Sequence, residues 1–408
     1  MTLLSAGSPP ASAAGPLSHS RQWRPEVVQA VPPPGAVDLG PGYLDPALLP
    51  VDLLKNAYGQ ALEEFGSAAL GYGADPGARL LRECVAARAT AADGRWCDPD
   101  QVLITAGTSQ ALQLVSTAMA VPGQVVLTDR TSYDFGRRII TDQGLRLRAV
   151  DGDEGGMSPR ALHDALSAVR AAGGTPAFAY VNPTHHNPTG TTLDLARREE
   201  LLAVAARHDL LVVEDDAYAE LTLADTAPPS SLAALARHAG VVRLGTFAKT
   251  LAPGLRLGWL QAHHSVADRL VRRGLFVSGG CLNHLTSLAV AVLLRDGHYD
   301  RHLRWLRREL KTRRDALVAA LRANPACRAE FDRPAGGFFL WLRFPAGRSE
   351  AELVSTAADA GVTVAAGSRF GEVTRPSIRL AYSFNPPERL ATAASLLAGA
   401  WTTTGNPS

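Results

Sequence analysis

Short apolar runs that alternate with helical segments constrain the fold of this chain more than any other feature. Five runs read as buried strands, at 102–105, 124–128, 177–181, 210–213 and 241–244. Segments with helical periodicity lie before and between them, at 53–65, 79–89, 111–120 and 193–207. Strands that alternate with helices form a parallel sheet, and ligands bind beyond the carboxyl ends of such strands. The sequence therefore predicts an α/β fold whose mostly parallel central sheet is flanked by helices.

The last third of the chain predicts a second, smaller unit. A long helical stretch that begins at Gly297-His298 carries leucines on one stripe and arginines on a solvated face. Beyond it, 334–344 and 377–383 read as strands. The predicted domains are a disordered or extended tail over 1–37, a large domain over 38–295 and a smaller α/β C-terminal domain over 296–408. The stretch 38–50 is a candidate to pack against the small domain.

Charge and cysteine usage exclude several classes of protein. A formal net charge of +2 over 408 residues calls for neither nucleic acid nor an anionic membrane as a partner. The four cysteines are scattered and form no CxxC pair, which argues against a disulfide framework and against a zinc site. Residues 1–20 lack the basic and apolar regions of a signal peptide, and no apolar run is long enough to cross a bilayer. We therefore expect a soluble cytoplasmic protein.

The fifth apolar run leads into the segment with the most distinctive chemistry. Gly245 and Thr246 are expected to break the strand, and Lys249 follows in a tight loop among apolar residues. Desolvation disfavours the charged form of such a lysine and makes its amine a better nucleophile toward an aldehyde. Thr246 and Arg256 supply a hydroxyl and a planar cation that suit a phosphate. Pyridoxal 5′-phosphate (PLP) is an aldehyde that carries a phosphate ester, although a solvated surface lysine would fit the same segment.

The first strand leads into a second candidate phosphate site. Ala106-Gly-Thr-Ser-Gln110 joins this strand to the helix that follows it. A glycine turn with hydroxyls before a helix presents free N–H groups and the positive end of the helix dipole to an anion. Thr108 and Ser109 are therefore candidate phosphate ligands, or else plain helix caps.

Polar and aromatic residues follow the remaining strands. Asn187 lies in a turn-rich stretch after the third strand, and its amide can donate to a phenolate oxygen. Glu214-Asp-Asp216 follows the fourth strand, where a buried carboxylate needs a cation such as a pyridinium nitrogen. A solvated or metal-binding acidic loop would give the same three residues. Tyr218 is placed to donate to a neighbouring oxygen, and Tyr133 can cover a planar ring or belong to the core.

Three further features lie away from these strand ends. The loop 37–46, rich in glycine and proline, either brings backbone such as that of Gly42 close to a ligand or is simply a connection. Arg379 lies in an apolar strand and needs a partner, either a structural carboxylate or a substrate carboxylate held bidentately. His185 and His186 are metal candidates in principle, but adjacent residues rarely chelate one ion, so we expect no metal.

Taken together, these segments resemble the class I and II aminotransferases, a group of PLP-dependent enzymes of fold type I. The resemblance runs from about Asp38 to the end of the chain, nearest to the branch of 2-aminoadipate and other broad-specificity aminotransferases. The phrases that carry it are Asp38-Leu-Gly-Pro-Gly-Tyr-Leu-Asp-Pro46, Thr105-Ala-Gly-Thr-Ser-Gln-Ala-Leu112, Asn187-Pro-Thr-Gly190, Glu214-Asp-Asp-Ala-Tyr218, Gly245-Thr-Phe-Ala-Lys-Thr250 and Ser377-Ile-Arg-Leu380. Each phrase alone is modest, and their order and spacing together are specific.

The resemblance implies a role for each candidate residue. It implies that Lys249 forms the internal aldimine and later moves a proton, and that Asp215 keeps the pyridine nitrogen protonated. The implied contacts to the cofactor's ring and phosphate come from Tyr133, Asn187, Tyr218, Thr108, Ser109, Thr246 and Arg256. The implied substrate contacts come from Arg379, Asn187 and Gly42. Tyr72 would reach the phosphate of the neighbouring subunit, which makes the enzyme an obligate homodimer with shared active sites.

Two features depart from the family's pattern. Ala248 stands where relatives often have a serine, which removes one possible phosphate contact. His185-His186 and the loop 278–284 are expected where relatives line the substrate pocket. A reaction other than transamination therefore stays open.

The implied function is the exchange of an amino group between an L-amino acid and a 2-oxo acid. The alternative is another PLP-dependent reaction of an amino acid, namely elimination, substitution, cyclisation or oxidation, in a specialised biosynthetic pathway. A third hypothesis is the effector half of a transcription factor, since some bacterial regulators carry this fold behind a winged-helix domain. Residues 1–37 are too few for that domain, so we expect an enzyme.

Overall fold

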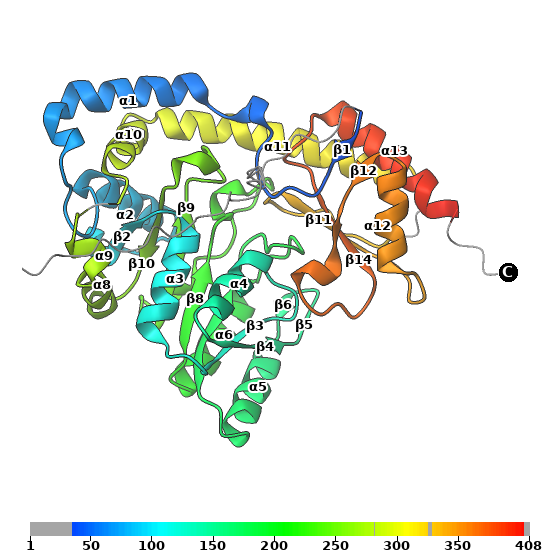
Figure 1. Cartoon of the computed structure of the whole chain (residues 1–408), viewed down its shortest axis with the longest axis horizontal. Coiled ribbons are helices and arrows are strands. Elements are labelled where there is room, and N and C mark those ends of the chain that lie inside the picture. Colours follow the sequence, from blue (N-terminus) through cyan, green and yellow to red (C-terminus); the bar gives the residue numbers. More distant parts are fainter. Residues whose placement is uncertain (1–34, 281, 325–328, 404–408) are drawn as a thin grey trace, which may run out of the picture.

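The computed structural model describes residues 35–280, 282–324 and 329–403, and the predicted tail lies outside these residues up to residue 34. A seven-stranded sheet and a three-stranded sheet lie side by side beneath a layer of long helices (Figure 1). The seven strands are β2 (Val102–Thr105), β3 (Val125–Asp129), β4 (Arg146–Val150), β7 (Pro176–Val181), β8 (Leu211–Asp215), β9 (Val241–Thr246) and β10 (Gly258–Gln261). A short hairpin, β5 (Gly152–Asp153) and β6 (Gly156–Met157), follows β4.

The larger sheet has the order β2-β10-β9-β8-β7-β3-β4. The strands from β9 to β4 run parallel to their neighbours, whereas β10 is antiparallel to both β9 and β2. The prediction of a mostly parallel sheet is therefore confirmed. The antiparallel strand β10 was not foreseen. It lies between β9 and β2, and Gly258 pairs with the last residue of each, so the carboxyl ends of β9 and β2 lie at the same edge of the sheet.

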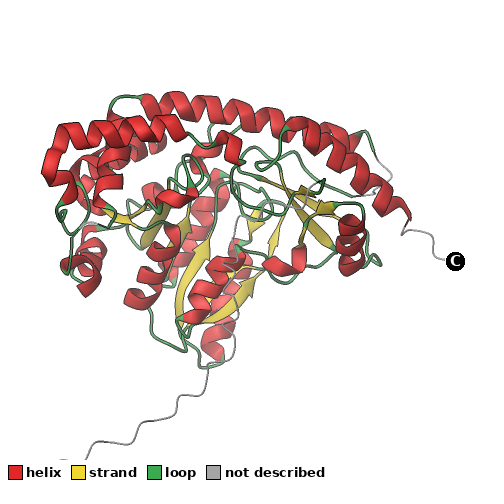
Figure 2. Ribbon diagram, turned by 45° about the horizontal axis from the view of Figure 1, so that its top comes forward, coloured by secondary structure: helices red, strands yellow, loops and turns green. Residues whose placement is uncertain are grey.

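Helices cover both faces of this sheet (Figure 2). Alternate side chains of a strand point to opposite faces, so Val126 and Phe178 pack with α3 and α8, whereas Leu127 and Ala179 pack with α5 and α6. The helices are α1 (Val51–Phe65), α2 (Arg79–Asp93), α3 (Thr108–Met119), α4 (Asp134–Asp142), α5 (Pro159–Ala171), α6 (Leu195–Arg207), α7 (Leu232–Leu235), α8 (His264–Val271), α9 (Gly274–Val277) and α10 (His284–Arg295). Short 3-10 turns include η4 (Ala219–Leu221) and η7 (Gly367–Phe370). In the part of the chain with assigned structure, no helix combines the length and the apolar surface needed to traverse a lipid bilayer.

The smaller sheet has the order β11-β14-β13 and lies near the carboxyl end of the chain. Its elements are β11 (Phe339–Arg343), β13 (Ala365–Ala366) and β14 (Ser377–Ala381), with α12 (Glu350–Asp359) and α13 (Pro387–Thr403) packed beside them. The 25-residue helix α11 (His298–Arg322) runs from the layer over the larger sheet to α13 (Figure 1). The long helix predicted from the leucine stripe thus joins the two parts of the molecule. The domain boundary at residue 295 stays a prediction.

The segment after the predicted tail attaches to the smaller sheet region. Strand β1 (Val37–Asp38) pairs in parallel with β12 (Val362–Thr363), and the Leu39 carbonyl accepts a hydrogen bond from Ala381 N at 2.7 Å. The disordered or extended tail was predicted to run through Val37, and the structure shows Val37 as an extended residue that is already paired with Val362. The loop that follows is thereby held over the carboxyl edge of the larger sheet.

Two predicted strand ends are wrong, and glycines explain both. Gly245 and Thr246 do not break β9 but continue it, since the Trp259 ring packs on the Gly245 backbone where a β-carbon would overlap it. The strand predicted over 334–344 begins only at residue 339. Gly336 and Gly337 turn the chain closely past a buried histidine, where a β-carbon on Gly336 would overlap the His185 ring.

Candidate active site

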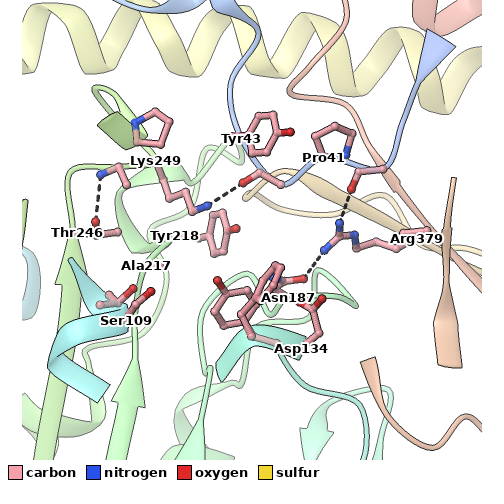
Figure 3. A pocket seen from close by; sticks show the side chains of 18 of the residues that line it. Pro41, Tyr43, Ser109, Asp134, Asn187, Ala217, Tyr218, Thr246, Lys249 and Arg379 are labelled. Atoms are coloured by element: carbon pink, nitrogen blue, oxygen red, sulfur yellow. Dashed lines mark hydrogen bonds between the residues drawn. The ribbon is translucent and has the colours of Figure 1, made fainter. Parts of the chain in front are cut away.

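A cavity of about 440 Å³ lies where the carboxyl ends of the larger sheet face the smaller sheet. The sequence had placed twelve residues in the candidate site, and eleven of them line this cavity (Figure 3). They are Gly42, Thr108, Ser109, Tyr133, Asn187, Asp215, Tyr218, Thr246, Lys249, Arg256 and Arg379. The turns after β2, β3, β7, β8 and β9 each contribute to the wall, which is the geometry expected of ligand sites in parallel sheets.

Lys249 lies in the loop after β9, among the buried side chains of Phe247, Leu251 and Leu257. Its amine donates to the carbonyl of Gly42 at 2.7 Å and lies 5.6 Å from the centre of the Tyr218 ring. Burial and the nearby Arg379 lower the pKa of the Lys249 amine to about 8. A larger fraction of this amine is therefore neutral and nucleophilic near neutral pH than for an ordinary lysine.

The three carboxylates at the end of β8 have different surroundings. Glu214 accepts from the backbone N–H groups of Leu232 and Ala233 at the start of α7, at 2.8 and 2.9 Å. Asp216 accepts from Arg243 Nε and Nη2 at 2.9 and 2.6 Å. Both therefore have structural partners, and neither is among the described residues that line the cavity, whereas Asp215 is. Asp216 Oδ1 has no hydrogen-bond partner among the described residues, but it lies outside the cavity lining.

Asp215 is buried and keeps one oxygen available. Its Oδ2 accepts from the Tyr180 hydroxyl at 2.5 Å, whereas Oδ1 makes no hydrogen bond to any residue that the structure describes. Burial raises the pKa of this carboxyl to about 6. A buried carboxylate oxygen without a partner is costly, and a protonated ring nitrogen would satisfy it.

The turn between β2 and α3 forms a cradle for an anion. Gly107 has a φ of +90°, and the helix begins at Thr108 and Ser109, whose N–H groups lie in the first helical turn. The Arg256 guanidinium lies against Gly107, where a β-carbon would approach it to 3.2 Å, and it donates to the Ala106 carbonyl at 3.1 Å. Thr246 lines the same cavity. Helix dipole, backbone amides and arginine together suit a phosphate.

Arg379 and Asn187 form the opposite end of the cavity. Arg379 donates through Nη1 to Asn187 Oδ1 at 2.8 Å and through Nη2 to the Gly40 carbonyl (Figure 3). The centres of the Phe339 and Phe370 rings lie 4.1 and 4.4 Å from the guanidinium carbon of Arg379. Burial lowers the pKa of Arg379 to about 10, and its Nε has no hydrogen-bond partner among the described residues. A carboxylate is the anion that such a fork binds best.

The structure adds Tyr180 and Asn182, which the sequence had not singled out. Tyr180 is fully buried in β7 and donates to Asp215, and the Asn182 side chain donates to the Asp215 backbone carbonyl. A tyrosine within an apolar strand needs a hydrogen-bond partner for its hydroxyl, and this was the one available signal.

The expectation that His185 and His186 line the substrate pocket is wrong. His185 hydrogen-bonds Thr222 and Thr192 at 2.9 and 3.2 Å, and His186 Nδ1 lies 2.8 Å from Thr189 Oγ1. Neither residue is among the described residues that line the cavity, because the turn after β7 directs both rings into the protein interior. Burial lowers the pKa of each to about 4, so both rings are neutral near pH 7.

Tyr72 and the loop 278–284 lie together, outside this cavity. The Tyr72 side chain is 89% exposed, and a β-carbon on Gly279 would lie 3.6 Å from its ring. Gly280 packs so closely on Gly73 that a β-carbon there would overlap the Gly73 backbone. Within one chain, none of the described residues of this loop, which exclude Cys281, lines the cavity. The expected place of the loop at the substrate pocket therefore stays a prediction.

Comparison with known proteins identifies the family. Residues 43–397 match the family model of aminotransferase class I and II. The chain belongs to this family. The uncharacterized HTH-type transcriptional regulator YisV of Bacillus subtilis (strain 168) is 34% identical over 88% of this chain and 73% of that protein. The 2-aminoadipate transaminase of Thermus thermophilus is 33% identical over 90% of each chain.

A solved structure supports the same conclusion for the fold and cofactor. The crystal structure of α-aminoadipate aminotransferase from Thermus thermophilus, complexed with N-(5′-phosphopyridoxyl)-L-leucine, aligns with a TM-score of 0.81. It is 31% identical, and the alignment covers 92% of this chain and 96% of that one. This class I and II aminotransferase is thus a PLP-dependent enzyme of fold type I, and the predicted fold class, enzyme class and cofactor are confirmed.

The residues of the cavity fit PLP. The amine of Lys249 suits the aldehyde, the available Oδ1 of Asp215 suits the ring nitrogen, and the cradle at Gly107 suits the phosphate. Ala248 offers no hydroxyl to that phosphate, so the first turn of α3, Thr246 and Arg256 would have to hold it. Arg379 would then be left for a substrate.

Proposed function

We propose that this aminotransferase exchanges an amino group between an L-amino acid and a 2-oxo acid, with the cofactor attached to Lys249. One observation carries the proposal: three incompletely satisfied groups meet in one cavity. They are a lysine whose pKa is lowered, a carboxylate with one oxygen lacking a hydrogen bond among the described residues, and an arginine whose Nε lacks one. Each matches a different part of PLP or of an amino acid.

Asp215 and Tyr218 would tune the cofactor's ring. When bound, PLP supplies a ring that withdraws electrons from the α-carbon of the amino acid. Asp215 Oδ1 would hold a proton on the ring nitrogen, and Tyr180 keeps the other oxygen of this carboxylate in place. Tyr218, which is buried against Phe338 and Phe339, would donate its hydroxyl to an oxygen on the ring. Asn187 can do the same through Nδ2, because its Oδ1 already accepts from Arg379.

Lys249 and Arg379 would act on the substrate. Arg379 binds the α-carboxylate, which fixes the amino acid's orientation beside Lys249. When it is not attached to the cofactor, the neutral Lys249 amine would take the proton from the α-carbon of the substrate. It would then deliver this proton to the carbon C4′ of the cofactor. Gly42 contributes its carbonyl oxygen, which accepts from Lys249 Nζ and would accept from a substrate amine at the same place.

A single half-reaction tests this function. Adding an L-amino acid alone should abolish the absorbance band of the lysine-bound cofactor and release one equivalent of a 2-oxo acid, and adding a 2-oxo acid should restore the band. The relative named for 2-aminoadipate makes this amino acid the first donor to test, followed by a panel of L-amino acids. Release of ammonia, or loss of the band without a 2-oxo acid product, would favour the alternative PLP-dependent reactions over transamination.

We also propose that two subunits share each active site, through Tyr72. A phenol that is 89% exposed on a glycine-rich turn is available to a second copy of the chain, and the loop 278–284 beside it would approach the same neighbouring site. A symmetric dimer uses such a patch twice, so both sites form together.

Subunit mixing should reveal this sharing. Tyr72→Ala and Lys249→Ala subunits are each expected to be inactive, and each lesion falls in a different half of a shared site. After complete exchange of a one-to-one mixture, about half of the dimers are mixed and each has one intact site, so activity should recover to about a quarter of wild type. If independent labels show exchange and no activity returns, Tyr72 does not serve the neighbouring site.

A further inference from the structure

A buried hydrogen-bond cluster lies behind the Lys249 loop, and the proposed reaction does not use it. Tyr299 on α11 is fully buried, and its hydroxyl is hydrogen-bonded to Glu220 Oε2 at 2.5 Å and to Thr250 Oγ1 at 2.8 Å. Thr250 follows Lys249 directly, and Glu220 lies in η4, which begins just after Tyr218. We call Tyr299, Glu220 and Thr250 the Tyr299 cluster. None of its members is among the described residues that line the cavity.

Arg88 of α2 holds this cluster from the side of the larger sheet. Its Nε donates to Glu220 Oε1 at 2.9 Å, and its Nη1 donates to Asp300 Oδ1 at 2.6 Å. The guanidinium carbon lies 4.7 Å from the centre of the Tyr299 ring, where a cation is attracted to the aromatic face. Arg88 therefore fixes both the carboxylate that accepts from Tyr299 and the Tyr299 ring itself.

Two more side chains of α11 hold the same segments through their backbones. His302 Nε2 lies 2.8 Å from the carbonyl oxygen of Thr250, and Arg307 Nε donates to the carbonyl of Glu220 at 2.7 Å. The loop after Lys249 and the turn after Tyr218 are thus both attached to one rigid helix. Only the Tyr299 hydroxyl, among the α11 groups described, bonds to both segments at once.

We propose that Tyr299 is a positioning residue of the active site: its hydroxyl joins the loop that carries Lys249 to the turn that carries Tyr218. This rests on the proposed function, in which both side chains meet the cofactor. The Lys249 amine lies 5.6 Å from the centre of the Tyr218 ring. The Tyr299 cluster, which lies outside the cavity lining, would fix that separation by holding the two segments together. A displacement of about 1 Å can lower a rate about a hundredfold, so a hydroxyl that never touches the cofactor can govern turnover.

The substitution Tyr299→Phe removes this hydroxyl, and Tyr382→Phe is a matched control. Tyr382 is also fully buried, and its hydroxyl donates to the carbonyls of Gly336 and Gly337 at 2.9 and 2.8 Å, outside the described cavity lining. Tyr299→Phe should lower kcat of the loaded enzyme about tenfold to a hundredfold with KM nearly unchanged. It should also slow the capture of added PLP by Lys249 in cofactor-free protein by a similar factor. Tyr382→Phe should leave kcat and capture near wild type, even where both variants lose similar amounts in Tm.

Thr250 offers an independent test in case Tyr299→Phe folds poorly. Thr250→Val removes the hydroxyl at nearly constant volume and should lower kcat and PLP capture as Tyr299→Phe does. Thr250→Ser keeps the hydroxyl and should keep kcat near that of the wild type. Unchanged kcat and capture in Tyr299→Phe, or equal losses in Tyr382→Phe, would overturn the proposal. If the wild-type protein holds PLP but transfers no amino group, the proposed function fails, and the capture rates still decide the role of Tyr299.

Discussion

Replacing Lys249 by alanine should abolish amino transfer, with turnover lower by about a thousandfold or more. The side chain would supply both the covalent attachment of the cofactor and the proton transfer at the α-carbon. In the cavity no second lysine can take its place, because the chain's other lysines are Lys55 and Lys311 and neither lines it. Steady-state turnover with an amino acid and a 2-oxo acid measures the loss.

The other two lysines supply matched controls for this experiment. Lys55 is exposed on α1, and Lys311 on α11 lies 3.6 Å from the exposed Asp225. Lys55→Ala and Lys311→Ala should therefore turn over like the wild type. The Lys249→Ala protein should still bind PLP, without the covalent bond, through the anion cradle and Asp215. Turnover near wild type in Lys249→Ala would refute the site.

Replacing Asp215 by asparagine should lower turnover, whereas replacing Asp216 by asparagine should lower stability. Asp215→Asn removes the carboxylate that would keep the ring nitrogen protonated, and turnover should fall about a hundredfold or more. Asp216→Asn weakens the buried pair with Arg243, which also binds Asp93 at 3.0 Å, and should cost about 1–3 kcal/mol of unfolding free energy. Turnover of the folded Asp216→Asn protein should stay close to wild type.

Turnover and denaturant unfolding of both variants together decide between these roles. Both substitutions are isosteric and replace neighbouring carboxylates that are each 5% exposed, so each variant controls for the other. Equal losses of turnover in the two variants would remove the reason for assigning the ring nitrogen to Asp215. A large loss of stability in Asp215→Asn without loss of turnover would give it a structural role instead.

The sequence was sufficient for the parallel part of the larger sheet because its strands are buried on both faces and read as apolar runs. It was insufficient at glycines. Gly245 reads as a strand breaker, yet it lies inside β9 because the Trp259 ring occupies the space of a side chain. Strand β10 follows β9 directly after the loop 247–257, and no local pattern specifies its antiparallel place between β2 and β9.

The residues of the candidate site also fall into those that the sequence predicts and those that it does not. Lys249, Asp215 and Asn187 could be predicted because strand ends of a parallel sheet converge, whatever lies between them. His185 and His186 could not, since the direction of a side chain after a strand depends on the turn, and here the turn buries both rings. Tyr180 and Tyr299 act on Asp215 and Thr250 through contacts 35 and 49 residues apart, which no local pattern reveals.

The most direct test of the central claim is to locate the lysine that holds the cofactor. The protein loaded with PLP is reduced with borohydride, digested, and its peptides are mapped by mass spectrometry. Because Lys55, Lys249 and Lys311 are the chain's lysines, the result is unambiguous. We predict a pyridoxyl group on the peptide that contains Lys249. A label on Lys55 or Lys311 in its place, or no stable label in a protein that still transfers amino groups, would contradict the account.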